Sequence, residues 1–196
     1  MAKLVYSAIM SLDGFIEDQA GKFDWAEPDR EVHTFINALV ARHGTHLYGR
    51  SMYEVMAAWE SEDLSKGVPD HVQEFASIWR AAQKVVYSTS LERVTTSRTR
   101  LESHFDAEAI QAMKASTDRD ITIAGPGLAA QAFRVGLVDE CHMFVAPTAV
   151  GGGKSAMPMG LAVRLRLVEE RRFGNGVVYL RYDVKPESRG AEGQGA

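Results

Sequence analysis

The hydrophobic and polar positions in the first fifty residues predict a strand, a turn and a helix. Residues 3–10 form a compact, partly β-branched apolar run that leads into Ser11-Leu12-Asp13-Gly14, the pattern of a buried strand followed by a turn. Beyond Pro28, apolar residues recur every three or four positions, as in an amphipathic helix: Val32, Phe35, Ile36, Leu39 and Val40. Gly44 is expected to end this helix.

The same two patterns alternate as far as residue 135. Strands are predicted at 46–48, 84–87 and 121–124, with a short one inside 95–105, and helices at 52–59, 71–79, 106–115 and 128–135. Residues 61–69 are polar and predict a loop. Because strands and helices alternate, this part of the chain favours parallel strands joined by crossover helices, and hence an α/β sheet.

The last third predicts β structure. Strands are expected at 140–145, 164–173 and 177–184, with a glycine loop at 151–153. Asn175-Gly176 has the composition of a two-residue hairpin turn, so the closing hairpin should add an antiparallel edge to the sheet. Residues 186–196 contain no apolar anchor and predict a disordered tail, which leaves 1–185 as one domain.

Composition narrows the class of protein. The 196 residues suit a single globular domain with 45% apolar residues and a formal net charge of −4. No apolar run approaches about 18 residues and no signal segment is visible, so we expect neither membrane insertion nor secretion, and a cytoplasmic location. The mildly acidic balance also argues against broad nucleic-acid binding.

Several kinds of chemistry lack their motifs. Cys141 is the one cysteine, and its place in a predicted strand favours a core residue over a nucleophile. The six histidines form no HxxxH or HExxH pair, so we expect no metal site. Gly151–Ser155 ends like a P-loop, but Thr148 occupies the position that requires the first glycine.

Three predicted strands end in small or polar turns beside a helix. The turns are Gly49-Arg50-Ser51, Ser88-Thr89-Ser90 and Gly125-Pro126-Gly127. In a parallel sheet all three lie at the carboxyl edge, where helix N-termini present free N–H groups to anions. The sequence therefore predicts that a phosphorylated ligand could lie along this edge.

Each turn also has a plainer interpretation. Residues 125–130 fit the GxGxxA pattern of a dinucleotide site, but Gly-Pro-Gly is also a common strand-to-helix turn, and Gly125-Pro126 is a candidate cis bond. Arg50 could grip phosphate oxygens, and the hydroxyls of 88–90 could surround a ribose 2′-phosphate, which would favour NADPH. The alternatives are a solvated arginine and a helix-capping serine.

Candidate groups for the reaction itself lie near the first helix. Asp29 or Glu31 could reach a pocket and protonate a substrate, although acidic residues also stabilise a helix N-terminus through its dipole. Trp25, Tyr53 and Trp59 could stack on a ring, but core packing explains aromatic residues equally well.

Taken together, these segments resemble a known family. The matching segments are residues 7–16, residues 47–54, residues 124–128, residues 136–140, and Pro147 with residues 150–153. In this order they resemble the dihydrofolate-reductase-like family, and more closely its branch akin to the RibD C-terminal reductase domain of riboflavin biosynthesis. The resemblance spans about residues 3–184.

The resemblance implies a mixed, mostly parallel sheet of about eight strands flanked by helices, an NADPH site at its carboxyl edge, and often a homodimer. It places Ala8 and Ile9 beside the nicotinamide carboxamide, and Asp13-Gly14 in a mobile loop over the ring. It assigns the cofactor phosphates to Gly49, Arg50 and Ser51, the 2′-phosphate to Ser88, Thr89 and Ser90, and the pyrophosphate and nicotinamide to Gly125, Pro126, Gly127 and Leu128.

Two departures from the family pattern affect which substrate can be assigned. Glu31 precedes Phe35 by the spacing of the acidic residue in folate reductases, but the segment before it would then hold an extra residue. Because no zinc-ligand motif is visible, we expect no deaminase domain before the reductase-like region. We therefore expect an NADPH-dependent reductase acting on an imine or carbonyl of a small pteridine- or pyrimidine-like substrate. The alternatives are another flavin- or nucleotide-using α/β enzyme, and an inactive nucleotide-binding or interaction protein on the same fold.

Overall fold

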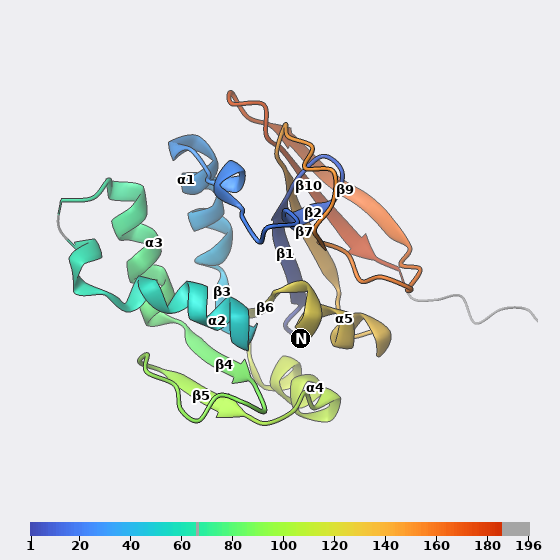
Figure 1. The fold of residues 1–196 in the computed structure, drawn as a ribbon. Coiled ribbons are helices and arrows are strands. Elements are labelled where there is room, and N and C mark those ends of the chain that lie inside the picture. The colour runs from blue at the N-terminus through green and yellow to red at the C-terminus, as the bar shows by residue number, and fades with distance from the viewer. Residues whose placement is uncertain (66, 186–196) are drawn as a thin grey trace, which may run out of the picture.

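An eight-stranded mixed sheet forms the centre of the computed structural model, which describes residues 1–65 and 67–185 (Figure 1). The strand order is β5-β4-β3-β6-β1-β7-β10-β9. The first six run parallel, whereas β10 is antiparallel to both β7 and β9. The predicted α/β class with an antiparallel hairpin is confirmed, and the predicted tail at 186–196 lies outside the described residues.

The strands of this sheet are β1 (Leu4–Met10), β3 (His43–Gly49), β4 (Gln83–Tyr87), β5 (Thr99–Glu102), β6 (Asp120–Ala124), β7 (Glu140–Val145), β9 (Leu165–Arg172) and β10 (Val178–Val184). A small second sheet pairs β2 (Phe15–Glu17) with β8 (Lys154–Ser155). The α-helices are α1 (Arg30–Val40), α2 (Arg50–Met56), α3 (Asp70–Ala81), α4 (Ala107–Ser116) and α5 (Pro126–Arg134). Short 3₁₀ turns cover Asp24–Ala26, Ala57–Glu60 and Glu62–Ser65.

Helices cover both faces of the sheet. The stripe of α1 packs on aromatic residues of the β7–β10 end, with Phe35 4.9 Å from Tyr179 and 5.4 Å from Phe173 between ring centroids. On the opposite face, α4 and α5 pack against β1, β3 and β6 in a larger core that includes Cys141. Cys141 is fully buried, as predicted, and burial raises the pKa of its thiol to about 12.

Three local predictions were wrong for identifiable reasons. Gly44 does not end the first helix, because α1 stops at Val40 and Gly44 lies inside β3, where a Cβ would come within 3.0 Å of the Arg119 Cβ. The β9–β10 turn has three residues, since the Phe173 N–H donates to the Val177 carbonyl. α5 starts at Pro126 rather than residue 128, and the Gly125–Pro126 bond is trans.

The described residues contain neither a membrane-spanning helix nor a cluster of metal ligands. Among residues 1–65 and 67–185, no helix is both long and apolar enough to cross a bilayer. Within the same ranges, no three His, Cys, Asp or Glu side chains are grouped so that they could hold a metal ion.

Candidate active site at the carboxyl edge of the sheet

The three predicted turns come together at one edge of the sheet. β4, β3 and β6 are consecutive neighbours, and the register pairs Gly49 with Tyr87 and Tyr48 with Ala124. The residues that follow these strands therefore lie side by side at their carboxyl ends. Sequence order alone would leave them about forty positions apart.

Gly125 forms the turn between β6 and α5. Its φ of +90° belongs to a region that residues with a side chain avoid, and a Cβ there would meet the Met52 Cβ at 3.4 Å. No side chain caps α5, and Ala129 is the first residue whose N–H bonds to the Gly125 carbonyl. The N–H groups of Gly127 and Leu128 thus point out of the helix start without an intrahelical partner.

The start of α2 resembles that of α5, and both differ from α1 and α4. Gly49 caps α2 without a side-chain hydrogen bond, whereas Asp29 and Asp106 accept N–H groups at the starts of α1 and α4. Where a carboxylate already occupies a helix start, a ligand anion has no place. The uncapped glycine starts of α2 and α5 leave room for one.

Arg50 brings positive charge to this edge. Its exposed guanidinium donates from Nη1 to Ser90 Oγ at 3.0 Å and from Nε to Glu54 at 2.7 Å. Ser88 is occupied in shaping the turn, because its Oγ accepts the N–H groups of Ser90 and Leu91. Ser51 and Thr89 are exposed beside them. The structure thus brings Arg50 and residues 88–90 together at this edge.

β1 reaches further than its neighbour β6. It pairs with β7 from Val5 to Met10, but with β6 only from Leu4 to Tyr6. On its β6 side, the backbone of Ser7 to Met10 therefore has no strand partner in the described sheet. Ala8 and Ile9 lie in this half-buried stretch, next to the glycine turn that follows β6.

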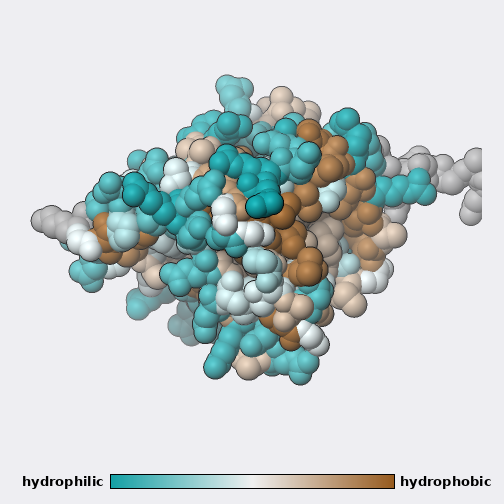
Figure 2. Space-filling view, turned by 90° about the horizontal axis from the view of Figure 1, so that it is seen from above, coloured by the Kyte–Doolittle hydropathy of each residue, from teal (hydrophilic) through white to brown (hydrophobic). Residues whose placement is uncertain are grey.

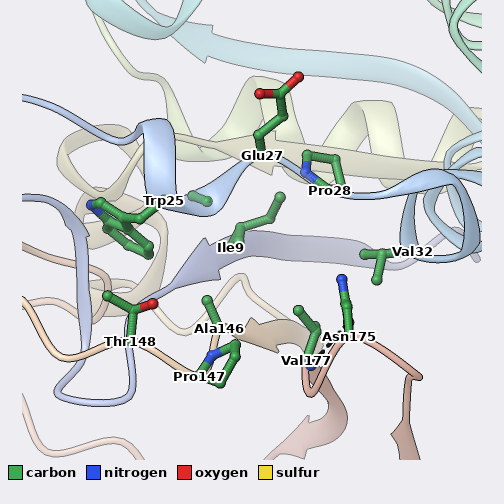
Figure 3. Close-up of a pocket in the computed structure, with 11 residues that line it drawn as sticks. Ile9, Trp25, Glu27, Pro28, Val32, Ala146, Pro147, Thr148, Asn175 and Val177 are labelled. Carbon is green, nitrogen blue, oxygen red and sulfur yellow. Dashed lines mark hydrogen bonds between the residues drawn. The ribbon is translucent and has the colours of Figure 1, made fainter.

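A cavity of about 160 Å³ lies at the end of β1, on the side of β7 and β10 (Figure 3). Ile9 forms its floor, Val32 of α1 lies at one end, and the indole of Trp25 lies at the other (Figure 3). The remaining walls come from residues 26–28, residues 146–148, Asn175 and Val177. Five separate segments of the chain therefore meet around this cavity.

Two polar side chains of the cavity have hydrogen-bonding groups to spare. Asn175 Oδ1 accepts the Val177 N–H at 3.1 Å, which leaves its amide nitrogen to face Val32 and Pro28 (Figure 3). Thr148 uses its backbone, since its N–H donates to the Ala146 carbonyl and its carbonyl accepts from Leu12. Its hydroxyl has no partner within the described part of the chain. The cavity thus offers amide donors and one hydroxyl, and its other lining residues apart from Glu27 are apolar.

The surface around this end of the molecule is partly apolar. Figure 2 looks down from above and shows a band of hydrophobic residues crossing a largely hydrophilic face. In the loops that follow β1, Leu12 is 71% exposed and Phe23 is 47% exposed. Uncovered apolar surface of this kind is typical of interaction sites.

Asp13 fastens the loop after β1 to the loop after β7. Its carboxylate accepts the N–H of Gly151 at 2.7 Å and the N–H of Val150 at 3.1 Å. A hydrogen bond from the Ser11 side chain, together with these backbone groups, lowers the pKa of Asp13 below its usual value. The Asp13-Gly14 loop is therefore tied to the segment that carries Thr148.

The predicted proton donors do not reach the cavity. Asp29 caps α1 by accepting the Val32 N–H at 3.0 Å. Glu31 faces the β9–β10 hairpin, where its carboxylate accepts the Gly174 N–H at 3.0 Å and pairs with Arg171 at 3.3 Å. Both carboxylates are engaged in holding α1, and neither lines this cavity.

Tyr53 also lies outside the cavity, because α2 turns it into the core. It is 3% exposed, and its hydroxyl accepts the Thr95 N–H at 2.9 Å. Trp59 packs on Phe75 with ring centroids 4.6 Å apart. Of the predicted aromatic residues, Trp25 alone lines the cavity.

Sequence patterns missed Thr148 and Asn175. Asn175 stands in the predicted hairpin turn and Thr148 lies between the predicted strand at 140–145 and the glycine loop at 151–153, but no motif marks either side chain. Asn175 was explained by its turn, and Thr148 entered only as the residue that disqualifies a P-loop. Their contribution depends on the hairpin folding back beside β1, which no local pattern reports.

Comparisons with known proteins agree with this architecture. A model of the RibD C-terminal domain matches residues 2–179. The uncharacterized protein YyaP of Bacillus subtilis (strain 168) is 26% identical over 186 residues, which cover 92% of this chain and 94% of that protein.

Solved structures share the fold at lower identity. A Shewanella sp. PV-4 protein, provisionally named a riboflavin biosynthesis protein, superposes with a TM-score of 0.73 at 20% identity, covering 95% of this chain and 100% of that one. A pyrimidine reductase-like protein from Corynebacterium diphtheriae superposes with a TM-score of 0.67 at 16% identity, covering 95% of this chain and 93% of that one.

A third solved structure is larger. The Thermotoga maritima protein named a diaminohydroxyphosphoribosylaminopyrimidine deaminase/5-amino-6-(5-phosphoribosylamino)uracil reductase gives a TM-score of 0.63 at 12% identity, with 94% of this chain and 57% of that one covered. Because the domain model spans nearly all of the described residues and the sheet has the same architecture, this chain belongs to the RibD C-terminal domain family.

Proposed function

We propose that this protein is an NADPH-dependent reductase that delivers hydride to an imine or carbonyl of a small pyrimidine-like heterocycle. One observation carries the proposal. The end of β1 lies between the glycine turn that follows β6 on one side and the cavity beside β7 and β10 on the other. A cofactor held at the turn and a ring held in the cavity would meet at Ala8 and Ile9.

The backbone at the cofactor side fits a dinucleotide. Nothing lies within 4 Å of a Cβ built on Gly127, so a pyrophosphate could approach the free N–H groups of Gly127 and Leu128 closely. The unpartnered edge of β1 at residues 7–10 would bind the carboxamide. When bound, the nicotinamide supplies the hydride, and the chain positions it and excludes water.

Arg50 is the proposed determinant of NADPH over NADH. Its guanidinium is always charged and presents a fork that suits phosphate oxygens. Nη1 is already directed at Ser90, and the exposed hydroxyl of Thr89 lies in the same turn. A 2′-phosphate bound here would gain a charge-assisted contact that NADH cannot make.

The proton for the reduced product comes, in this proposal, from water rather than from a carboxylate. Asp29 and Glu31 are bound to α1 and the hairpin, while the Thr148 hydroxyl faces the cavity with no protein partner among the described residues. This hydroxyl can hold a water molecule next to the ring and pass hydrogen bonds in either direction.

Glu27 lines the cavity, but its carboxylate extends away from the ring space (Figure 3), and Asp29 and Glu31 are engaged elsewhere. This lack of a directed proton donor favours a second candidate, a nucleotide-binding protein without catalysis. The two candidates differ in one measurable respect. Both bind NADPH, but only a reductase oxidises it when a pyrimidine-type acceptor is added.

We also propose a cytoplasmic homodimer, as the resemblance implies. All eight residues of β9 are exposed, among them Leu165, Leu167 and Val168, and β9 is an edge strand of the sheet. An exposed edge with apolar side chains is a template for pairing with another chain. Light scattering of the wild type and of Leu167→Lys tests this, with a dimer expected for the first and a monomer for the second.

Thermal unfolding with added NADPH, NADH or FMN tests the cofactor assignment. At a concentration a hundredfold above its Kd, a ligand adds about 2.7 kcal/mol to the free energy of unfolding. For a chain of this length, that raises Tm by roughly 5–10 °C. We expect this shift with NADPH and a smaller one with NADH.

A matched pair of variants locates the site. Arg50→Ala should weaken NADPH binding about 10–100-fold, the range for a hydrogen bond to a charged group. Arg164→Ala, an exposed arginine before β9, should leave NADPH binding unchanged. No shift with any nucleotide at saturation would disprove the cofactor site, and a shift without NADPH oxidation by any acceptor would favour the binding protein.

A further inference from the structure

We infer that the cavity beside Ile9 selects a single-ring heterocycle that carries no phosphate group. The inference rests on the proposed function, because it assigns the acceptor of the same site. It separates this protein from the Thermotoga maritima relative, whose name specifies a phosphoribosylamino-pyrimidine substrate. Three independent features of the cavity carry it: its volume, its charge and its hydrogen-bonding groups.

The volume suits one ring. The cavity measures about 160 Å³, and an apolar cavity of about 150 Å³ binds benzene. A six-membered heterocycle therefore fills the space between Trp25 and Val32. A second fused ring would project out of the open side of the cavity, where it would bury less surface than the first.

The lining contains no cationic group to bind a phosphate. None of its eleven residues is Lys, Arg or His, and its only charged member is Glu27. The nearest helix start, that of α1, is already occupied because Asp29 accepts the Val32 N–H. The usual protein partners of a phosphate, an arginine fork or an open helix N-terminus, are therefore both missing here.

The rim would repel an anion that projected from the cavity. Residues 24–31 contain four carboxylates and one guanidinium. In Figure 3, the Glu27 carboxylate extends away from the ring space towards the rim. Arg171 is paired with Glu31 and stacks on Phe35 and Phe173, in a separate surface hollow that also includes Arg30. Residues 24–31 thus carry a net negative charge, which would repel a phosphate that projected past them.

The polar groups require a ring with an acceptor. Asn175 Oδ1 is used by the Val177 N–H, so its amide faces the cavity only as a donor. The Thr148 hydroxyl can donate or accept. A ring carbonyl or ring nitrogen satisfies Asn175, and an N–H or carbonyl satisfies Thr148, the combination found in a uracil-like ring.

Calorimetry with three probes tests the inference without requiring turnover. The probes are 5-amino-6-ribosylaminouracil, its 5-phosphate, and 7,8-dihydropterin as a bicyclic ring, each titrated with and without NADPH. We expect the unphosphorylated uracil to bind at least tenfold more tightly than its phosphate and more tightly than dihydropterin. Equal or tighter binding of the phosphate, tighter binding of dihydropterin, or no binding by any probe would each overturn the inference.

Charge variants identify the cause of the selection. Glu27→Lys should raise the affinity for the phosphorylated probe threefold or more, an effect that falls with added salt, and Glu27→Gln should give a smaller gain. Asp118→Lys makes the same charge change before β6, at the opposite edge of the sheet, and should have no effect. An equal gain in Asp118→Lys would assign the selection to net charge and refute the role of the rim.

Asn175→Asp tests the donor. It keeps the shape of the side chain and the contact to Val177 but replaces N–H groups with a carboxylate oxygen, so uracil binding should fall at least tenfold. An unchanged urea-unfolding midpoint shows that the hairpin is intact, and unchanged binding in a folded variant refutes the donor role.

If NADPH fails to bind while the uracil binds as expected, the reductase function fails and the account of the cavity stands. If NADPH is oxidised and the phosphorylated uracil is the preferred acceptor, the reductase function stands and the account of the cavity fails.

Discussion

Acid should destabilise this protein through two histidines buried in β3. His43 is 4% exposed and His46 is 2% exposed. Burial lowers the pKa of His43 to about 4 and that of His46 to about 3, from an ordinary value of 6.5. Neighbouring positive charge adds to the effect: His142 and Arg119 act on His43, while His43, Lys84 and Arg119 act on His46. Asp120 and Glu140 oppose the shift at His43.

Hydrogen bonds fix the neutral form of His46. Trp79 Nε1 donates to the Tyr48 hydroxyl at 3.0 Å, and that hydroxyl lies 2.7 Å from His46 Nδ1. With its oxygen already accepting from Trp79, Tyr48 donates to His46. The neutral ring of His46 therefore carries its proton on Nε2, and a second proton would have to bind at Nδ1 and displace the hydrogen bond from Tyr48. Neither His46 Nε2 nor His43 Nδ1 finds a partner in the described residues, so a positive charge on either ring would be buried without an acceptor.

The sign and size of the effect follow from linkage. The folded-state pKa values are depressed, so the stability from these neutral histidines is complete above pH 6.5 and is lost as the pH falls towards 4. At pH 5 the unfolded chain binds about one more proton per histidine than the folded chain does. The free energy of unfolding therefore falls by about 1.4 kcal/mol for each histidine per unit decrease in pH. Between pH 8 and pH 5 the two histidines together should lower the free energy of unfolding by about 4 kcal/mol. This is a large part of the roughly 5–15 kcal/mol by which a typical domain is stable.

Urea unfolding at pH 8, 6.5, 5.5 and 5 measures this dependence. His46→Gln, which can still accept from Tyr48, should lower the slope at pH 5 by about 1.4 kcal/mol per pH unit, whatever it costs in absolute stability. His104→Gln removes an exposed histidine and should leave the slope unchanged. If wild type and His46→Gln lose stability in parallel, the reasoning about buried neutral histidines is refuted.

Three further changes test the site. Gly125→Ala puts a side chain at a φ of +90° and should destabilise the fold by about 1–3 kcal/mol in urea unfolding while weakening NADPH binding, whereas Gly127→Ala, with open space around it, should not destabilise. Asp13→Ala removes the acceptor for the Gly151 and Val150 N–H groups, so proteolysis in 148–153 should accelerate several-fold with little change in Tm; an unchanged digestion rate would disprove the fastening. Glu31→Gln should keep kcat within about threefold, because a proton donor typically contributes 10²–10⁴-fold; a hundredfold loss would make Glu31 that donor.

Most elements could be predicted because burial on one face leaves a regular trace in the sequence. The stripe of α1 is apolar because Phe35, Ile36 and Leu39 pack on the sheet, and β1 is a continuous apolar run because helices cover both of its faces. The prediction that Gly44 ends the first helix was wrong because a glycine that ends a helix and a glycine that admits a neighbour inside a strand look alike in sequence. The neighbour here, Arg119, is seventy-five positions away.

The two halves of the site differ in how far they could be predicted. The cofactor side is made of strand-to-helix turns, and a turn such as Gly125-Pro126-Gly127 carries its own local signature. The cavity is made of side chains whose direction depends on distant packing. Glu31 and Tyr53 had suitable chemistry, but Arg171 and Thr95 engage them elsewhere, whereas Thr148 and Asn175 reach the cavity only through the closing hairpin.

The central position of β1 has a consequence for the chain during synthesis. Its partners β6 and β7 come much later, as the Lys3–Asp120 hydrogen bond across 117 positions illustrates. A ribosome adding ~5–20 residues per second needs roughly 6–20 s to deliver the first of them. Throughout that interval an apolar strand has both edges open, which invites pairing with the wrong chain. The strand that joins the two halves of the site thus waits for both of its partners during synthesis, and slowing translation before residue 120 should increase aggregation.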